Sequence, residues 1–169
     1  MQIPMVRTSS ALTLCLVSAL ACARQPSSEA AKPGATLDSL SVGRGACYGT
    51  CEIYDFVVRR DGTATLTRKS VASPFPLPAG EAQRLLTAAS DGGLAALPTK
   101  IRGDSTLCPL DATDHSTVIV TAYAAGTTRR IEHYTGCYIS HDLRVAPALE
   151  RLVILERRVD ALVVSKPGG

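Results

Sequence analysis

The chain has 169 residues, of which 46% are hydrophobic and 4% aromatic, and its formal net charge is +3. This composition is ordinary for one globular domain, and the scarcity of aromatic residues means that the core must consist mainly of Leu, Val, Ile and Ala. The charge is small and no block of five or more basic residues occurs, so we expect no nucleic-acid partner.

Residues 1–21 have the pattern of a bacterial signal peptide. Arg7 supplies the positive charge, and an apolar run of ten residues follows that is too short to span a bilayer. Ala19 and Ala21 are the small residues that export cleavage before Cys22 requires. The stretch also resembles a lipobox, in which the cysteine after a small residue is acylated, although Ala19 stands where Leu is usual.

Residues 22–36 predict a flexible tether, because they are polar and rich in Ala, Ser and Pro. Such a segment reaches about 20 Å from a surface. We expect Cys22 to carry lipid and to anchor the protein to the bacterial envelope, on the periplasmic face of the outer membrane; without lipid, the protein is periplasmic or secreted. The membrane is then one partner, and an envelope protein of unknown identity is a second.

Residues 37–165 are expected to form a single globular domain, followed by a disordered tail at residues 166–169. The first element is an edge strand at residues 37–42, where apolar and polar side chains alternate weakly.

The next segment predicts a β-hairpin. Residues 52–60 have apolar side chains at every second position, and residues 63–69 alternate in the same way. Asp61 and Gly62 between them are a favoured pair for a hairpin turn. Residues 73–78 contain three prolines and predict a break in regular structure.

A helix and a second hairpin follow, and a second helix ends the domain. Residues 79–90 and 145–163 have apolar side chains at helical spacing, and residues 117–123 and 128–134 alternate as strands. The predicted class is therefore α+β. An antiparallel sheet of about five strands is covered by two helices, in the order hairpin, helix, hairpin, helix after the N-terminal strand.

Four cysteines lie in the predicted domain, and an even number in an exported chain indicates disulfides. The hairpin at residues 117–134 brings its two flanks together, which favours a bond between Cys108 and Cys137. Gly49 permits the tight turn that a bond between Cys47 and Cys51 requires.

The same cysteines allow three other interpretations. The alternative function is that of a thiol–disulfide redox protein that uses Cys47 and Cys51. Three residues separate these cysteines, and no Lys or His adjoins them to lower the pKa of a thiol. Zinc binding by the four cysteines and the histidines lacks the paired short spacings of zinc ribbons. Residues 45–49 have the outline of a nucleophile elbow, but a strand follows where that elbow needs a helix. We therefore expect no metal, no cofactor and no catalytic residue.

The remaining polar residues are interpreted as structural. The Asp-His pair at residues 114–115 precedes a strand and the His-Asp pair at residues 141–142 precedes a helix, as turn or cap residues do. His133 alternates with Arg130 and Glu132, which suggests a solvated strand face. Four arginines could bind an anionic partner, and ordinary scattered surface charge accounts for them equally well: Arg129, Arg130, Arg157 and Arg158.

The segment from Arg44 to Thr63 resembles the bacterial domain of unknown function 6438 family, whose members open with two cysteines around a glycine, then a tyrosine and an Asp-Gly hairpin. The resemblance covers about residues 37–163, and Glu52 stands where the family has proline. The matching positions are Cys47, Gly49, Cys51, Tyr54, Asp61, Gly62 and Asp114. The resemblance implies the hairpin fold and no activity, and Cys108 and Cys137 look like an additional bridge outside the motif.

The sequence therefore predicts a lipid-anchored envelope protein whose domain is a non-catalytic binding or structural module.

Overall fold

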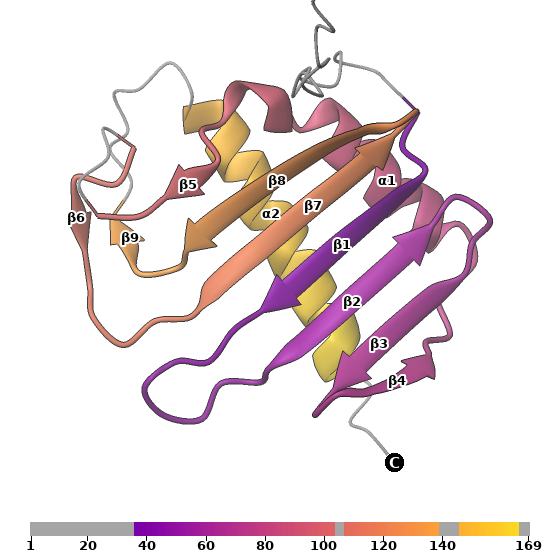
Figure 1. The fold of residues 1–169 in the computed structure, drawn as a ribbon, viewed down its shortest axis with the longest axis horizontal. Helices are drawn as coiled ribbons and strands as arrows, with labels where there is room; N and C mark the ends of the chain where they lie inside the picture. The colour runs from indigo at the N-terminus through magenta and orange to yellow at the C-terminus, as the bar shows by residue number, and fades with distance from the viewer. Residues whose placement is uncertain (1–35, 104–106, 139–145, 166–169) are drawn as a thin grey trace, which may run out of the picture.

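A computed structural model describes residues 36–103, 107–138 and 146–165. Five predicted features lie outside the described residues: the signal peptide, the lipidation site Cys22, the tether up to residue 35, the tail at residues 166–169 and the pair at residues 141–142. In the described part, a seven-stranded sheet carries two α-helices on one face, and a small two-stranded sheet lies beside it (Figure 1).

The strand order in the large sheet is β4-β3-β2-β1-β7-β8-β5. Its strands are β1 (Ser39–Arg44), β2 (Tyr54–Arg59), β3 (Ala64–Arg68), β4 (Val71–Pro74), β5 (Lys100–Ile101), β7 (Thr117–Ala124) and β8 (Thr127–Tyr134). All neighbours are antiparallel except β5 and β8, which are parallel. The small sheet pairs β6 (Leu110–Asp111) with β9 (Cys137–Tyr138) in antiparallel fashion.

The α+β class and the two helices are as predicted, but the sheet differs in three respects. It has seven strands instead of about five, it is mixed, and β1 lies at its centre between β2 and β7 instead of at an edge. The additional strands β4 and β5 give weak sequence signals, because every residue of β4 is exposed and β5 has two residues. β4 also extends to Pro74, within the proline-rich stretch, since an edge strand tolerates proline.

The helices α1 (Glu81–Asp91) and α2 (Ala146–Val164) pack against the same face of the sheet, and a short 3₁₀ helix, η1 (Leu94–Ala96), follows α1 (Figure 1). Apolar side chains at helical spacing on α2 meet the inward side chains of the strands. The fully buried positions on this interface include Leu40, Val42, Phe56, Val58, Val118, Val120, Ile131, Leu149, Leu152 and Val159. The core is aliphatic apart from an edge-to-face contact between Phe56 and Phe75.

An ion pair fastens the two helices to each other. Glu81, which begins α1, is buried and accepts hydrogen bonds from Arg84 Nε at 2.8 Å and Arg158 Nε at 2.6 Å. The hydrogen bonds from Arg158 hold the pKa of Glu81 below its ordinary value of 4.5. The carboxylate therefore stays ionised and positions the first turn of α1 against α2.

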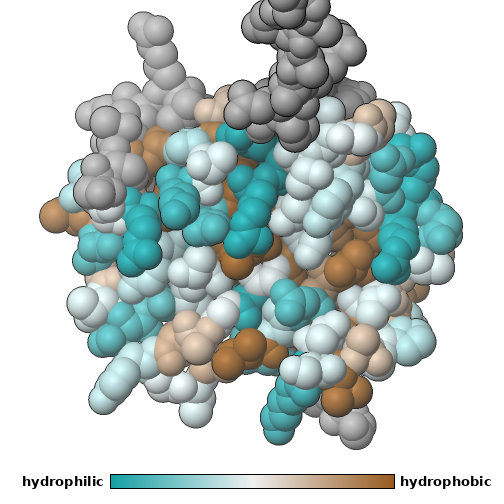
Figure 2. Space-filling view, viewed as in Figure 1, coloured by the Kyte–Doolittle hydropathy of each residue, from teal (hydrophilic) through white to brown (hydrophobic). Residues whose placement is uncertain are grey.

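The opposite face of the sheet has no helix over it and carries small and polar side chains. Figure 2 views this face, where hydrophilic and neutral residues surround scattered hydrophobic ones. The central strand β1 contributes Ser39 and Ser41, and its neighbour β7 contributes Thr121 opposite Ser41. The sheet therefore has one apolar face and one solvated face, as alternating antiparallel strands generally have.

Truncation of the core at α2 is expected to destabilise the domain. Leu152→Ala removes a fully buried side chain between α2 and the sheet and should lower the free energy of unfolding by about 2–5 kcal/mol. Ile154→Ala on the same helix is the control, because Ile154 is 64% exposed, and it should change the value by less than about 0.5 kcal/mol. Urea denaturation measures both; equal effects would contradict the packing of α2.

Candidate functional site

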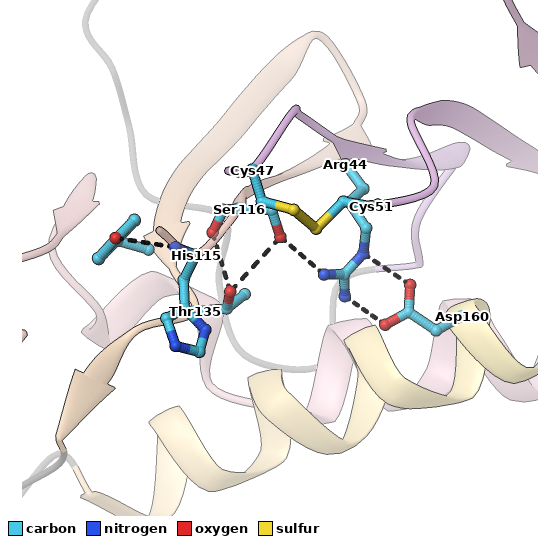
Figure 3. The surroundings of a disulfide bond; sticks show 8 residues. Arg44, Cys47, Cys51, His115, Ser116, Thr135 and Asp160 are labelled. Carbon is cyan, nitrogen blue, oxygen red and sulfur yellow. Dashed lines mark hydrogen bonds and ion pairs between the residues drawn. A yellow bond between two sulfur atoms is a disulfide. The ribbon is translucent and has the colours of Figure 1, made fainter. Parts of the chain in front are cut away.

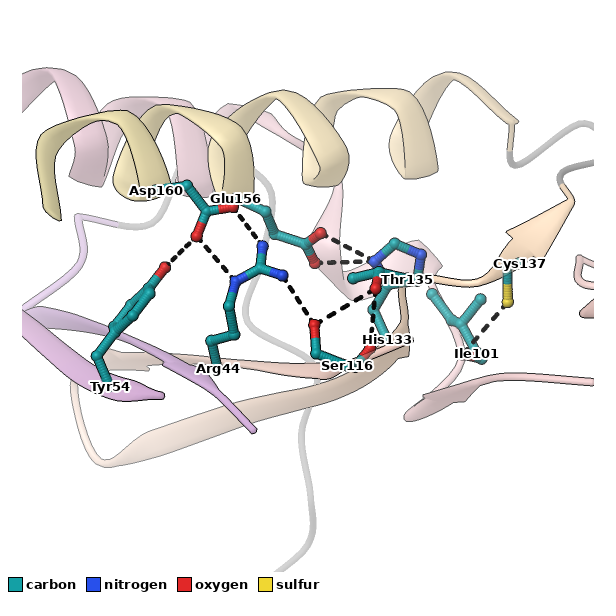
Figure 4. Close-up of polar contacts among 9 residues, drawn as sticks. All are labelled: Arg44, Tyr54, Ile101, Ser116, His133, Thr135, Cys137, Glu156 and Asp160. Atoms are coloured by element: carbon teal, nitrogen blue, oxygen red, sulfur yellow. Dashed lines mark hydrogen bonds and ion pairs between the residues drawn. The ribbon is translucent and has the colours of Figure 1, made fainter. Parts of the chain in front are cut away.

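Polar side chains from four strands or strand ends and from α2 gather at one end of the interface between α2 and the sheet (Figure 4). Because neighbouring strands are antiparallel, β1 ends where β2 and β7 begin and where β8 ends. Arg44, Tyr54, Ser116 and Thr135 occupy these positions. The fold thus brings together residues that are far apart along the chain.

Asp160 on α2 is the centre of this cluster. Its carboxylate accepts hydrogen bonds from Arg44 Nε at 2.9 Å and from the Tyr54 hydroxyl at 2.5 Å, and Arg44 Nη2 pairs with its second oxygen. Arg44 Nη1 also donates to Ser116 Oγ at 2.8 Å. Burial, together with the hydrogen bond to Asp160, raises the pKa of Tyr54, so its hydroxyl remains a donor.

A second polar pair, His133 and Glu156, lies beside this cluster. His133 Nδ1 lies 3.0 and 2.9 Å from the two carboxylate oxygens of Glu156, and both residues are buried. An ionised carboxylate only accepts hydrogen bonds, so Nδ1 carries the proton of this contact. The interpretation of His133 as part of a solvated strand face was wrong. Along β8, His133 shares the inward face with Ile131, whereas Arg130 and Glu132 point outward.

A cavity of about 280 Å³ lies between these two groups and α2. On α2, its lining residues occur at positions i, i+3, i+4 and i+7, which share one helix face. The residues around it are Arg44, His133, Thr135, Cys137, Val153, Glu156, Arg157 and Asp160. The cavity therefore combines buried charged groups with space for a small molecule.

The four domain cysteines form the two disulfides that the sequence predicts, Cys47–Cys51 and Cys108–Cys137. The first closes the loop between β1 and β2 and lies beside Arg44 and Ser116 (Figure 3). Gly49 inside this loop has a φ of 126°, a conformation that residues with a side chain rarely adopt. The second joins β9 to the segment before β6, and its Cys137 lines the cavity.

The other residues of the family-like motif lie in turns and do not form one site. Gly62 has a φ of 88° in the turn between β2 and β3, where Asp61 accepts hydrogen bonds from Thr63. Those hydrogen bonds lower the pKa of Asp61. Asp114 lies in the turn before β7 with a φ of 73°, and His115 beside it is exposed. The turn around Asp61 lies at the opposite end of the sheet from the Cys47–Cys51 loop.

The four arginines considered for an anionic partner do not form one patch. Arg129 donates to the carbonyl oxygens of Leu94 and Leu97, and Arg130 pairs with a neighbour on its own strand. Arg158 is bound to α1, and Arg157 lines the cavity.

Sequence reasoning missed Ser116, Glu156 and Asp160 as site residues. For Glu156 and Asp160, the sequence does contain a signal that could have identified them. They directly follow Leu155 and Val159, which belong to the buried apolar stripe of α2. A carboxylate at the margin of an apolar stripe needs a partner, but the stripe does not tell which strand supplies it.

The fold and the site together define a small α+β domain with two disulfides and a polar cavity beneath its long helix. A family model described as domain of unknown function (DUF6438) matches residues 38–153. The chain belongs to this family, as the resemblance of its cysteine motif predicts. No curated protein matches it in sequence.

Two further findings concern only the described residues. No helix there is long and apolar enough to cross a membrane. No group of three or more His, Cys, Asp or Glu side chains there is placed to hold a metal ion.

The hydrogen bond from Tyr54 to Asp160 predicts an alkaline dependence of stability. Because folding raises this pKa, the contribution of Tyr54 is fully present below pH 10.0, the ordinary value of the group, and is lost as the pH rises above it. Tyr54→Phe should cost about 1–2 kcal/mol near pH 7. Above pH 10, the wild type should lose up to about 1.4 kcal/mol per pH unit more than the variant.

Chemical denaturation at several pH values measures this difference. Tyr48→Phe is the control, because Tyr48 is 86% exposed and should not change the pH dependence. Parallel stability curves for the wild type and Tyr54→Phe would contradict the role of this hydrogen bond.

Proposed function

We propose that this chain is an exported, lipid-anchored protein of the bacterial envelope whose domain is a non-catalytic binding or structural module. The observation that carries the proposal is the pairing of all four domain cysteines in disulfides, which persist in oxidising compartments. It agrees with the signal-peptide pattern and with Cys22 at the start of a polar tether.

The contacts within the polar cluster favour binding or a structural role over catalysis. Arg44, Tyr54 and Asp160 satisfy one another through hydrogen bonds, and Arg44 is held further by Ser116. Side chains held in this way form a rigid wall, and the adjoining cavity provides room for a ligand.

The position of the tether fits such a role. Residue 36 lies three positions before β1, and the Cys47–Cys51 loop follows the other end of the same strand. Six extended residues separate the two ends by about 20 Å. An anchor at Cys22 would therefore attach the domain at the end of the sheet opposite the disulfide loop and the cavity.

The lipid anchor is tested by metabolic labelling with a fatty acid in a bacterial host. The wild type should incorporate the label and fractionate with membranes, whereas Cys22→Ser should do neither. Cys15→Ser is the matched control, because Cys15 lies inside the predicted signal peptide and its loss should leave labelling unchanged. An unlabelled wild type, or a labelled Cys22→Ser, would refute the anchor.

Thiol titration and redox measurements separate this proposal from a redox function of Cys47 and Cys51. As a structural bond, Cys47–Cys51 should have a reduction potential below about −300 mV. Replacing both cysteines by Ala should lower the free energy of unfolding by about 2 kcal/mol, against about 3.5 kcal/mol for Cys108 and Cys137. Reactive thiols in the native domain would instead support the redox alternative. So would a reversible dithiol–disulfide couple with a potential near about −200 mV, which is in the range of thiol oxidoreductases.

A further inference from the structure

We propose that the cavity between β8 and α2 binds the carboxylate group of a small ligand, held between His133 and Arg157. This inference rests on the proposed binding function and names the ligand class and its site. Its first support is the imidazole of His133, whose Nδ1 is bound by Glu156. Nε2 forms no hydrogen bond within the described part of the chain and keeps some accessible surface, and His133 lines the cavity.

The orientation of the ring directs this free nitrogen away from Glu156. Figure 4 shows the imidazole of His133 with Glu156 on one side and Cys137 on the other. Both residues line the cavity together with His133. A ligand in the cavity therefore meets Nε2 without displacing the hydrogen bond to Glu156. Because a carboxylate only accepts hydrogen bonds, it binds together with a proton on Nε2, which then donates to it.

The second support is Arg157, which lies on the cavity-lining face of α2. Its neighbour Arg158 is bound to Glu81, and Arg44 across the cavity is bound to Asp160. Arg157, by contrast, forms no hydrogen bond or ion pair with the residues that the structure describes. Its guanidinium retains the planar pair of donors that suits a carboxylate.

The charges around the cavity favour a single negative charge on the ligand. Arg44 on β1 and Asp160 on α2 neutralise each other, and Glu156 on α2 is hydrogen-bonded to His133 on β8. Arg157 is the charged lining residue that has no such partner within the described part of the chain. Val153 and the sulfur of Cys137 provide apolar contacts, so the cavity of about 280 Å³ suits a carboxylate with a short substituent.

Other hollows in the described surface lack this combination. The one between α1 and α2 has a volume of about 480 Å³, but its two arginines, Arg84 and Arg158, already bind Glu81. The one beside Thr36 and Arg60 has a volume of about 160 Å³, and its Arg60 is paired with Asp38.

The probe is acetate, titrated into the full-length purified protein at constant ionic strength while the side-chain NMR signals of His133 are followed. Acetate should shift these signals saturably, and Arg157→Ala should raise the dissociation constant by at least about tenfold. Arg157 makes no contact that the fold requires, so the variant remains folded. Arg130→Ala is the matched control, because Arg130 lies on the opposite face of the sheet and should leave binding unchanged.

A second arm compares tri-alanine with its C-terminal amide, since a free acid and the end of a peptide present the same carboxylate. Binding of acetate alone assigns the site to free small acids, and binding of the peptide acid but not the amide extends it to peptide ends. No saturable shift with acetate, an equal shift with chloride, or an unchanged affinity in Arg157→Ala would overturn the proposal.

The two proposals fail separately. A protein that binds acetate but takes up no fatty acid would refute the anchor and leave the site standing, whereas a lipid-labelled protein without acetate binding would refute only the site.

Discussion

The contact of Asp160 with Arg44 and Tyr54 fixes α2 on the sheet, and the arrangement of the site depends on it. The three side chains join the C-terminal helix to β1 across 116 residues of chain and to β2 across 106. Arg44 extends the connection to Ser116 at the start of β7, and the Cys47–Cys51 disulfide closes the loop between the two strands. The local Cys47–Cys51 disulfide and the long-range hydrogen bonds of Asp160 thus stabilise the same end of the domain.

Charged groups in an interface between helix and sheet are costly unless each is paired. Here Asp160 and Glu81 are each bound by arginine, and Glu156 is bound by His133. An apolar interface of the same shape would stabilise the fold as well. Asp160 and Glu156 line the cavity, as do His133 and Arg157.

The two ends of the sheet differ in their content. At one end lie the start of β1 and the turn between β2 and β3, with Asp61 and Gly62 closing a hairpin. At the other end lie the Cys47–Cys51 loop, the polar cluster and the cavity. The family to which the chain belongs has no known function, so it assigns no activity to either end. An anchor at the N-terminus would attach the domain at the end that holds the start of β1.

Local chemistry in the sequence determined the α+β class, both helices, the Asp-Gly hairpin and the proximity of Cys108 to Cys137, because periodicity and turn residues act over a few neighbours. Only the tertiary structure decided that β1 is central, that β5 adds in parallel, and that His133 is buried. Alternation shows which residues share a face, yet it does not identify the neighbouring strand or the helix that covers it. The partner of a polar residue such as Asp160 is therefore decided by packing across the whole chain.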